Sequence, residues 1–412
     1  MTAAPLWLSA PEAASALRVS RATLYAYVSR GYIRSQAVRG RSRQREYSRE
    51  DVDKLRHRTE ERRSPDKAAA RALQWGMPVL ESSITLIDGM TLYYRGHDAI
   101  GLARTRSVEE VASLIWTGRF DVPFASASDT GLRVDSNRSL PFAARSQAML
   151  AAASARDRLA FDLRGENVAR RGWRILHLLA AAAIRGNAGR HPRRLRRRLP
   201  GEPATVDAAV ARAWNVDEKG RELIRTALIL CADHELNVSS FTARCVASAG
   251  SNPYAVVIAA LSALEGPKHG GAGARVEAML AHLRATPDVS SALAARLRRG
   301  ERVDGFGHPL YGNGDPRAAM LLERLRECFR RSTELTFIGR VVDAAARVTR
   351  EKPNLDFSLA ALTRVLDLPN EAPLMLFAVG RTIGWIGHAL EQYALDHLIR
   401  PRARYVGVPP VS

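Results

Sequence analysis

Two short apolar patterns at helical spacing open the chain, and a polar turn separates them. A capping-box pattern that begins at Ser9 predicts a first helix. The side chains that this helix is expected to bury are Ala13, Ala14 and Leu17. After the turn, the spacing predicts a second helix from Arg21 to Arg30, closed by Gly31. One face of it holds Leu24, Tyr27 and Val28, and the other holds Ala22, Tyr25, Ala26 and Ser29. Such a pair is typical of a helix-turn-helix.

The residues from Tyr32 to Tyr47 alternate as a short hairpin, and a further helix cap begins at Ser48. Residues 1–65 contain fourteen Lys/Arg and seven Asp/Glu, which leaves a net charge of +7. Arginines in the hairpin turn suit the phosphates beside a DNA groove. The residues predicted to contact DNA are Arg21, Ala22, Tyr25 and Ser29 on the second helix, and Arg39, Arg41 and Arg43 in the turn. The alternative is a small helical appendage used for protein contacts.

Beyond this region the pattern is overwhelmingly helical. A polar stretch at 59–67 is expected to be a linker, and residues 83–95 alternate around an Asp88-Gly89 turn, which predicts a hairpin. A second capping box begins at Ser107, and alanine-rich segments at 142–160 and 205–232 repeat apolar residues at helical spacing. The basic run at 190–198 is interpreted as a solvated loop.

Composition narrows the class of protein. The chain has 412 residues, of which 46% are hydrophobic and 25% charged, so it can bury a full core in two or more domains. Its formal charge of +20 points to anionic partners, but arginine supplies nearly all of it, so charge alone is poor evidence for DNA binding. The three cysteines form no CxxC pair, which argues against zinc and disulfides and fits a reducing cytoplasm. With neither a leader pattern nor a long apolar run, the expected location is cytoplasmic and not in a membrane.

The candidate chemistry is concentrated in four motifs. Residues 305–317 read Gly-Phe-Gly-His-Pro-Leu-Tyr-Gly-Asn-Gly-Asp-Pro-Arg, which sets an imidazole in a glycine-rich turn nine residues before a guanidinium. That pairing suits a carbonyl flanked by carboxylates. The other three motifs are Gly-Pro-Lys-His-Gly-Gly-Ala at 266–272, Pro-Asn-Leu-Asp-Phe at 353–357 and Arg-Thr-Ile-Gly-Trp-Ile-Gly-His at 381–388.

Together, and in this order, the motifs resemble the citrate synthase family from about Met77 to Gly407. The first 64 residues look like a winged helix-turn-helix domain of the MerR or excisionase type. The resemblance implies a mainly α, two-domain helical fold at 65–412, with a large subdomain (68–269 and 367–412), a small one (270–366) and the active site in the cleft between them. Closure of the small subdomain would exclude water from a reactive enol.

The resemblance also implies a role for each site residue. Asp356 would be the base that removes a proton beside the thioester, and His269 and His308 would donate to the thioester and ketone oxygens. His234, Arg317, Arg381 and Arg400 would bind the oxo acid, with Arg400 lent by the partner subunit of a homodimer. Acyl-CoA would lie along 302–307, at Val303, Gly305 and Phe306. It would be a substrate, and no permanently bound cofactor and no metal are expected.

The implied enzyme is an acyltransferase that turns the acyl group into an alkyl group, a citrate synthase of the tricarboxylic acid cycle. A Si-type enzyme is the hypothesis, although the stereochemistry stays open. Two departures from the family pattern, at Cys231 and at Gly273-Ala274, leave two substrates open: acetyl-CoA, giving citrate, or propionyl-CoA, giving 2-methylcitrate. A third reading is a DNA-binding regulator whose synthase-like domain senses metabolites.

Each site residue also has an ordinary structural interpretation. His234 and His269 could be interior histidines, Arg381 a surface arginine in an ion pair, and Asp356 a helix cap. His388 and Glu391, after Arg381, are assigned to structure.

Overall fold

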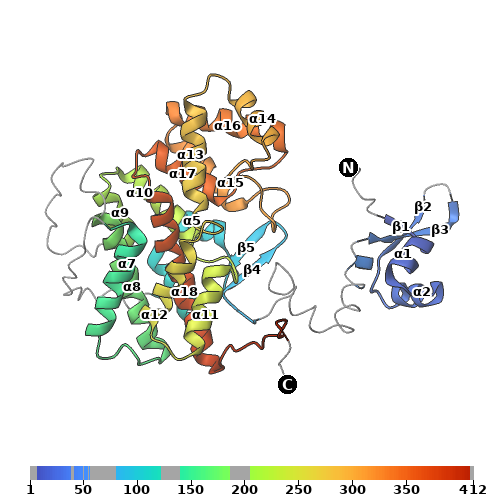
Figure 1. Ribbon diagram of the computed structural model, residues 1–412, viewed down its shortest axis with the longest axis horizontal. Helices are drawn as coiled ribbons and strands as arrows, with labels where there is room; N and C mark the ends of the chain where they lie inside the picture. The colour runs from blue at the N-terminus through green and yellow to red at the C-terminus, as the bar shows by residue number, and fades with distance from the viewer. Residues whose placement is uncertain are drawn as a thin grey trace. The chain divides into compact units, whose positions relative to one another are not determined.

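The computed structural model describes residues 7–38, 41–49, 51–53, 55, 80–121, 140–185 and 205–408 (Figure 1). The chain divides by its internal contacts into two units, Met1–Glu81 and Ser82–Ser412. Two predicted segments, the linker at 59–67 and the basic run at 190–198, lie outside the described residues. The predicted domain limits of 1–64 and 65–412, and the subdomain limits, stay predictions.

The first unit packs two helices on a small antiparallel sheet. Its elements are β1 (Trp7–Ser9), α1 (Ala10–Leu17), α2 (Arg21–Ser29), β2 (Ser35–Val38) and β3 (Arg41–Ser48), and the sheet order is β1-β3-β2. The capping box at Ser9 forms as predicted, and the Ser20 side chain caps α2. Ala13, Ala14, Leu17 and Leu24 are buried with Leu8, Ile33, Tyr47 and Val52 in one apolar cluster. The helix-turn-helix pattern is therefore confirmed at the level of packing.

Two details of this unit differ from the sequence prediction. Helix α2 ends at Ser29 rather than Arg30, and Gly31 follows with φ of 77°. Arg41 and Arg43 lie on strand β3 rather than in the turn, because Val38 pairs with Arg41 and the ladder continues that far. Arg39 lies outside the described residues.

The second unit begins with a small sheet. Strand β4 (Thr85–Asp88) pairs with β5 (Thr91–Tyr94) in antiparallel register, Asp88 opposite Thr91, and β6 (His97–Asp98) pairs with β5. The Asp-Gly hairpin is confirmed, and Gly89 has the positive φ of 59° that a tight hairpin turn requires.

Helices make up the rest of this unit. They are α5 (Ala99–Thr105), α6 (Val108–Thr117), α7 (Phe142–Arg156), α8 (Gly165–Arg185), α9 (Val206–Ala213), α10 (Glu218–Leu230), α11 (Val238–Ser248), α12 (Pro253–Leu264), α13 (Ala272–Arg284), α14 (Val289–Arg298), α15 (Pro316–Cys328), α16 (Thr333–Thr349), α17 (Leu355–Val365) and α18 (Ala372–Leu395). The capping box at Ser107 opens α6 as predicted. The mainly α fold is confirmed.

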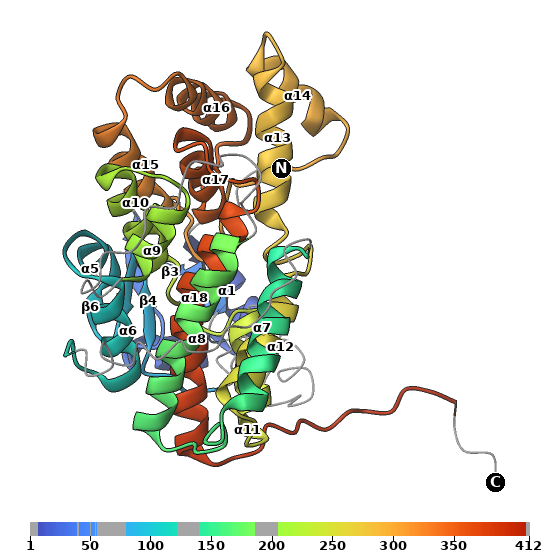
Figure 2. The ribbon, with the colours of Figure 1, turned by 90° about the vertical axis from the view of Figure 1, so that its left-hand side faces the viewer.

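Helix α18 is the central element of the unit. It packs against α6, α8, α10, α11, α12, α13 and α17, and both views show it running between the other helices (Figures 1 and 2). Helices α13 to α17 pack among themselves and meet the rest through α5, α10 and α18. Residues on α17 and α18 are thereby brought beside the loops that follow α10 and precede α15. Of the helices that the structure describes, none combines the length and apolar character needed to cross a membrane.

Candidate active site

Six of the seven residues predicted to form the catalytic and oxo-acid site come from separate elements and meet in one region of the second unit. His234 follows α10, His269 precedes α13, His308 precedes α15, Arg317 is in the first turn of α15, Asp356 is in the first turn of α17 and Arg381 is on α18. The positive charges of Arg317 and Arg381 both act to lower the pKa values of His234 and Asp356. The charge of Arg381 also lowers the pKa of His269. Packing between elements that are distant in the sequence therefore brings these six residues together.

The rings of His234 and His308 lie nearly perpendicular to each other beside Tyr311. Their ring centroids lie 5.2 Å apart, and His234 Nε2 is 2.9 Å from the Tyr311 hydroxyl. The Leu310 N–H donates to His308 Nδ1 at 3.2 Å, so Nδ1 is the acceptor and the proton of the neutral ring is on Nε2. Burial, with the charge of Arg317, lowers the pKa of His308 to about 4 and holds that of His234 well below its ordinary value. Both rings are therefore neutral at pH 7.

Arg317 is held by a neighbouring carboxylate. Asp315 caps α15, and its two oxygens accept from Arg317 Nε at 2.9 Å and from Nη2 at 2.8 Å. The same carboxylate accepts from the Leu355 N–H at the start of α17. Burial opposes the charge on Arg317, but Asp315 raises its pKa above the ordinary value. Asp315 accepts from Nε and from one N–H of Nη2. The N–H groups of Nη1 and the second N–H of Nη2 remain to donate to an anion.

Arg381 is buried rather than on the surface, with 1% of its area exposed. Its Nε donates to the carbonyl oxygen of Cys231 at 2.7 Å, and the guanidinium lies 4.6 Å from the centroid of the Phe377 ring. Its Nη1 is buried and has no hydrogen-bond partner among the described residues. A buried donor of this kind costs free energy unless something accepts from it. This atom can donate to an anionic ligand.

His269 lies in the glycine turn that leads into α13. A Cβ at Gly270 would lie 2.4 Å from the Leu264 carbonyl oxygen, so only glycine allows the turn to approach α12 this closely. His269 Nε2 is 2.9 Å from the Ser239 hydroxyl, and the ring stands edge-on to Phe377. Burial and the charge of Arg381 lower the pKa of His269 to about 4. The neutral ring has one N–H to donate.

Asp356 is not the helix cap, because Asn354 caps α17 through its side chain. Its side chain is half-buried, and loss of solvent around the carboxyl raises its pKa from the ordinary value of 3.8 to about 6. A carboxyl with this pKa is mostly ionised at pH 7 yet more basic than usual. The raised pKa suits a general base.

The loop predicted for CoA is clasped to the start of α17. The Asn354 N–H donates to the Gly305 carbonyl at 2.9 Å, and Asn354 Nδ2 donates to the Gly307 carbonyl at 3.1 Å. Gly305 has φ of 83°, and a Cβ there would lie 2.9 Å from Phe357 Cβ. The side chains of Val303 and Phe306 are buried, so a ligand along this loop would meet mainly backbone.

The seventh predicted residue, Arg400, is not brought to the other six. It is exposed in the extended segment after α18, which runs away from the helices in Figure 2. The described contacts join it to none of the site residues. In the first unit, Arg21, Ala22, Tyr25 and Ser29 are all exposed on α2, as the prediction of a DNA-facing side requires.

Sequence reasoning missed three residues that support the site. Tyr311 contacts His234 and Asp315 holds Arg317, and both lie inside the motif at 305–317, so their place in it was an available signal. Ser239, which contacts His269, lies two residues after Asn237 in the segment that carries His234. Among the described residues, no group of three His, Cys, Asp or Glu side chains is arranged to hold a metal.

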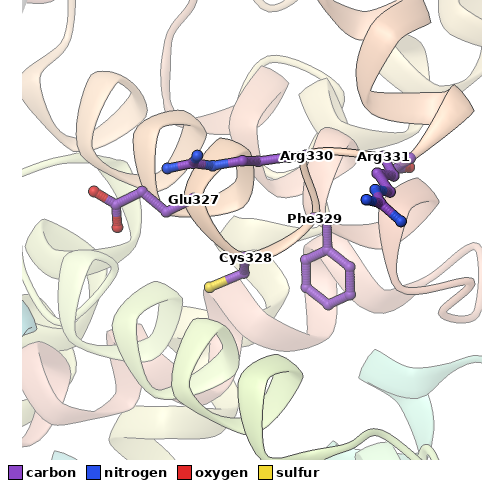
Figure 3. Close-up of a pocket in the computed structure, with 6 residues that line it drawn as sticks. Glu327, Cys328, Phe329, Arg330 and Arg331 are labelled. Carbon is purple, nitrogen blue, oxygen red and sulfur yellow. The ribbon is translucent and has the colours of Figure 1, made fainter.

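A surface hollow at the end of α15 is separate from these residues. It is lined by Glu327, Cys328, Phe329, Arg330, Arg331 and Ser332 (Figure 3). The labelled side chains point in different directions rather than toward one point. None of the predicted site residues lines it, so we assign it no role.

Comparisons with known proteins identify the family of the chain. The family model described as citrate synthase, C-terminal domain, matches residues 72–402, and a helix-turn-helix domain model matches 7–59. The citrate synthase of Haloferax volcanii is 34% identical over 81% of this chain and 94% of that protein. The 2-methylcitrate synthase of Shewanella oneidensis is 28% identical over 79% and 91%. The citrate synthase 2 of Bacillus subtilis is 42% identical, but that match spans 45% of this chain and 51% of the relative.

Among solved structures, the citrate synthase of Thermotoga maritima superposes with a TM-score of 0.68 at 26% identity, over 82% of this chain and 96% of that one. The family match covers far more than half of the chain, and its limits include all seven residues predicted for catalysis and oxo-acid binding. The chain belongs to the citrate synthase family and carries an N-terminal helix-turn-helix domain.

Proposed function

We propose that this chain condenses acetyl-CoA with oxaloacetate to give citrate and free CoA. The proposal rests on Nη1 of Arg381, which is buried and has no hydrogen-bond partner among the described residues. Arg317 lies near enough for its charge to act on the pKa of Arg381. Two buried guanidiniums that still have N–H groups to donate suit the two carboxylates of oxaloacetate. Neutral His234 and His308 beside them suit its ketone and its neighbouring oxygens.

Carbon–carbon bond formation follows from the remaining groups. Asp356 takes a proton from the methyl carbon of the thioester while His269 donates a hydrogen bond to the thioester oxygen. The resulting enol carbon bonds to the ketone carbon of oxaloacetate. His308 donates through Nε2–H to the ketone oxygen, which takes up one proton and becomes the hydroxyl. Water then cleaves the thioester, which releases CoA and leaves the third carboxylate.

A homodimer would complete the site with the partner's Arg400. Two features support this assignment. Arg400 is exposed and is joined by no hydrogen bond or ion pair to another described residue, and the segment around it exposes Leu398, Tyr405, Val406 and Val408. Exposed apolar side chains in one segment are typical of a surface that another chain covers. We assign the reaction to the cytoplasm, in keeping with three free cysteines.

The test is thiol release with oxaloacetate, comparing acetyl-CoA and propionyl-CoA side by side. Faster release with acetyl-CoA is the expected result. Faster release with propionyl-CoA would favour 2-methylcitrate synthesis, the activity named for the Shewanella relative. No release with either, from folded dimeric protein, would contradict the enzyme and favour a metabolite-sensing regulator.

A second function, DNA binding by the first unit, is favoured by the exposed face of α2 with Arg21, Ala22, Tyr25 and Ser29. Deleting residues 1–64 should remove binding whose affinity falls steeply with salt, because phosphate contacts release counterions. Full-length protein carrying Tyr25→Ala tests the helix itself, with Tyr93→Ala in the second unit as the control. An unchanged salt dependence after deletion would contradict DNA binding and favour a protein-contact appendage.

A further inference from the structure

The segment between α10 and α11, residues 231–237, carries His234 without forming a helix or strand. Glu235, the next residue, has φ of 53°, in the left-handed region that costs free energy for a residue other than glycine. His234 is nevertheless buried, with 8% of its area exposed. An irregular segment keeps one buried conformation only if neighbouring elements hold it.

Helix α18 holds this segment with three residues. Arg381 Nε donates to the Cys231 carbonyl, the Gly384 N–H donates to the Ala232 carbonyl at 2.9 Å, and His388 Nε2 lies 3.1 Å from Asp233 Oδ1. Spacings of three and four residues put all three on one face of the helix. A Cβ at residue 384 would lie 2.4 Å from the Ala232 oxygen, so glycine permits the close approach.

Of these three contacts, only the one from His388 is made to a side chain, and the other two are made to backbone carbonyls. Asp233 and His388 are both fully buried, and Thr85 on β4 donates to the other Asp233 oxygen at 2.6 Å. Burial alone would raise the pKa of Asp233, but the charge and hydrogen bond of His388 lower it. The carboxylate therefore accepts, and His388 Nε2–H donates. Removing one partner of a buried ionised group is costly.

We propose that His388 is a positioning residue for oxo-acid binding: through Asp233 it fixes the backbone that presents His234. The inference rests on the proposed function, because it concerns how the oxaloacetate side of that site is held. His388 touches no substrate. It contacts Asp233, the residue before His234. Arg381, on the same face of the helix, donates to the Cys231 carbonyl and is also predicted to bind the oxo acid. Loosening Asp233 therefore disturbs the oxo-acid half of the site and leaves the thioester half, at His269 and Asp356, in place.

The test compares three variants of the full chain. His388→Leu removes the donor, His388→Gln keeps an N–H of similar reach, and Tyr393→Phe removes a different hydrogen bond of the same helix, from Tyr393 to the Ser251 carbonyl. Calorimetry measures the Kd of oxaloacetate and of acetyl-CoA, and thermal unfolding measures stability. We expect His388→Leu to raise the Kd of oxaloacetate about tenfold or more, with acetyl-CoA changed by less than about twofold. His388→Gln should stay within about threefold of the wild type, and Tyr393→Phe should leave both constants unchanged.

A folded His388→Leu protein with the wild-type Kd for oxaloacetate would overturn the inference, as would equal losses in the Leu and Gln variants. If the Leu variant does not fold, Thr85→Val withdraws the other donor to Asp233. It should raise the Kd of oxaloacetate several-fold, and an unchanged value would equally overturn the inference. Failure of the wild type to bind oxaloacetate is a distinct result, because it contradicts the proposed function itself.

Discussion

Arg381 is tied to Cys231 through one nitrogen and leaves another unsatisfied. Its Nε donates to the Cys231 carbonyl across a separation of 150 residues, and its Nη1 is buried without a hydrogen-bond partner among the described residues. The first contact fixes the direction of the guanidinium, and the second atom is left for a ligand. An arginine anchored in this way binds at low entropic cost because its planar group is already oriented.

Replacing Arg381 by lysine should therefore weaken oxaloacetate binding although the charge remains. Lysine supplies a point charge and cannot hold the Cys231 carbonyl and a carboxylate at fixed angles. We expect the Kd of oxaloacetate to rise about 100-fold, typical of breaking a buried charged hydrogen bond. Calorimetric titration measures it. Arg364→Lys is the control, since Arg364 pairs with Glu277 and Glu334 on neighbouring helices and is not one of the predicted site residues. Equal losses in both variants would argue against a ligand role for Arg381.

Asp356→Asn should abolish turnover and leave oxaloacetate binding intact. A general base contributes about 10²–10⁴-fold in rate, and an amide cannot replace it. Thiol release measures turnover, and calorimetry measures binding. Turnover at the wild-type rate would contradict the assignment of Asp356 as the base.

The same substitution should make the folded protein more stable at high pH. The folded pKa of Asp356 lies above its unfolded value, so ionising it costs stability as pH rises from about 4 to above 6. A rise from 3.8 to about 6 corresponds to a cost on the order of 3 kcal/mol at pH 8. Urea unfolding at pH 5 and pH 8 should show the advantage of the Asn variant growing with pH. A constant difference would mean that Asp356 is not desolvated.

The pH dependence of kcat/KM should have an acidic limb near pH 6. Asp356 must be ionised to accept a proton, and burial raises its pKa to about 6. His269 and His308, with pKa values lowered to about 4 by burial and by nearby arginines, stay neutral across this window and add no limb. Initial rates at low acetyl-CoA, from pH 5 to pH 9, measure the limb. A limb below pH 5 would assign proton removal to another group.

Ser239→Ala should lower kcat by about 10-fold or more through the tautomer of His269. The Ser239 hydroxyl donates its one hydrogen to Asn237 Oδ1 at 2.9 Å, and its oxygen lies 2.9 Å from His269 Nε2. For Nδ1–H to become the donor to the thioester, the hydroxyl must turn and donate to Nε2 instead, and alanine removes this donor. Ser240→Ala is the matched control, because the buried Ser240 hydroxyl has no partner among the described residues. Steady-state kinetics compares the two, and an unchanged kcat in Ser239→Ala would remove this role.

Local elements could be predicted because their causes are local. The capping boxes at Ser9 and Ser107 and the Asp88-Gly89 hairpin each depend on a few adjacent residues, and all form as expected. The extent of β3 could not be predicted from the sequence, because Arg41 joins the sheet only by pairing with Val38 on the neighbouring strand. A pairing across strands leaves little trace in either strand alone.

The sequence by itself determined which chemical groups this protein has, in four motifs whose order indicates the family. Only the tertiary structure decided which of them meet. His234 reaches Tyr311 across 77 residues and His388 reaches Asp233 across 155, contacts that no periodicity encodes. Arg400, predicted for the same site, stays apart from the other six residues in its own chain. The pKa values divide in the same way, because burial and nearby charge, which set the proton affinities of Asp356 and His269, exist only once distant helices have packed together.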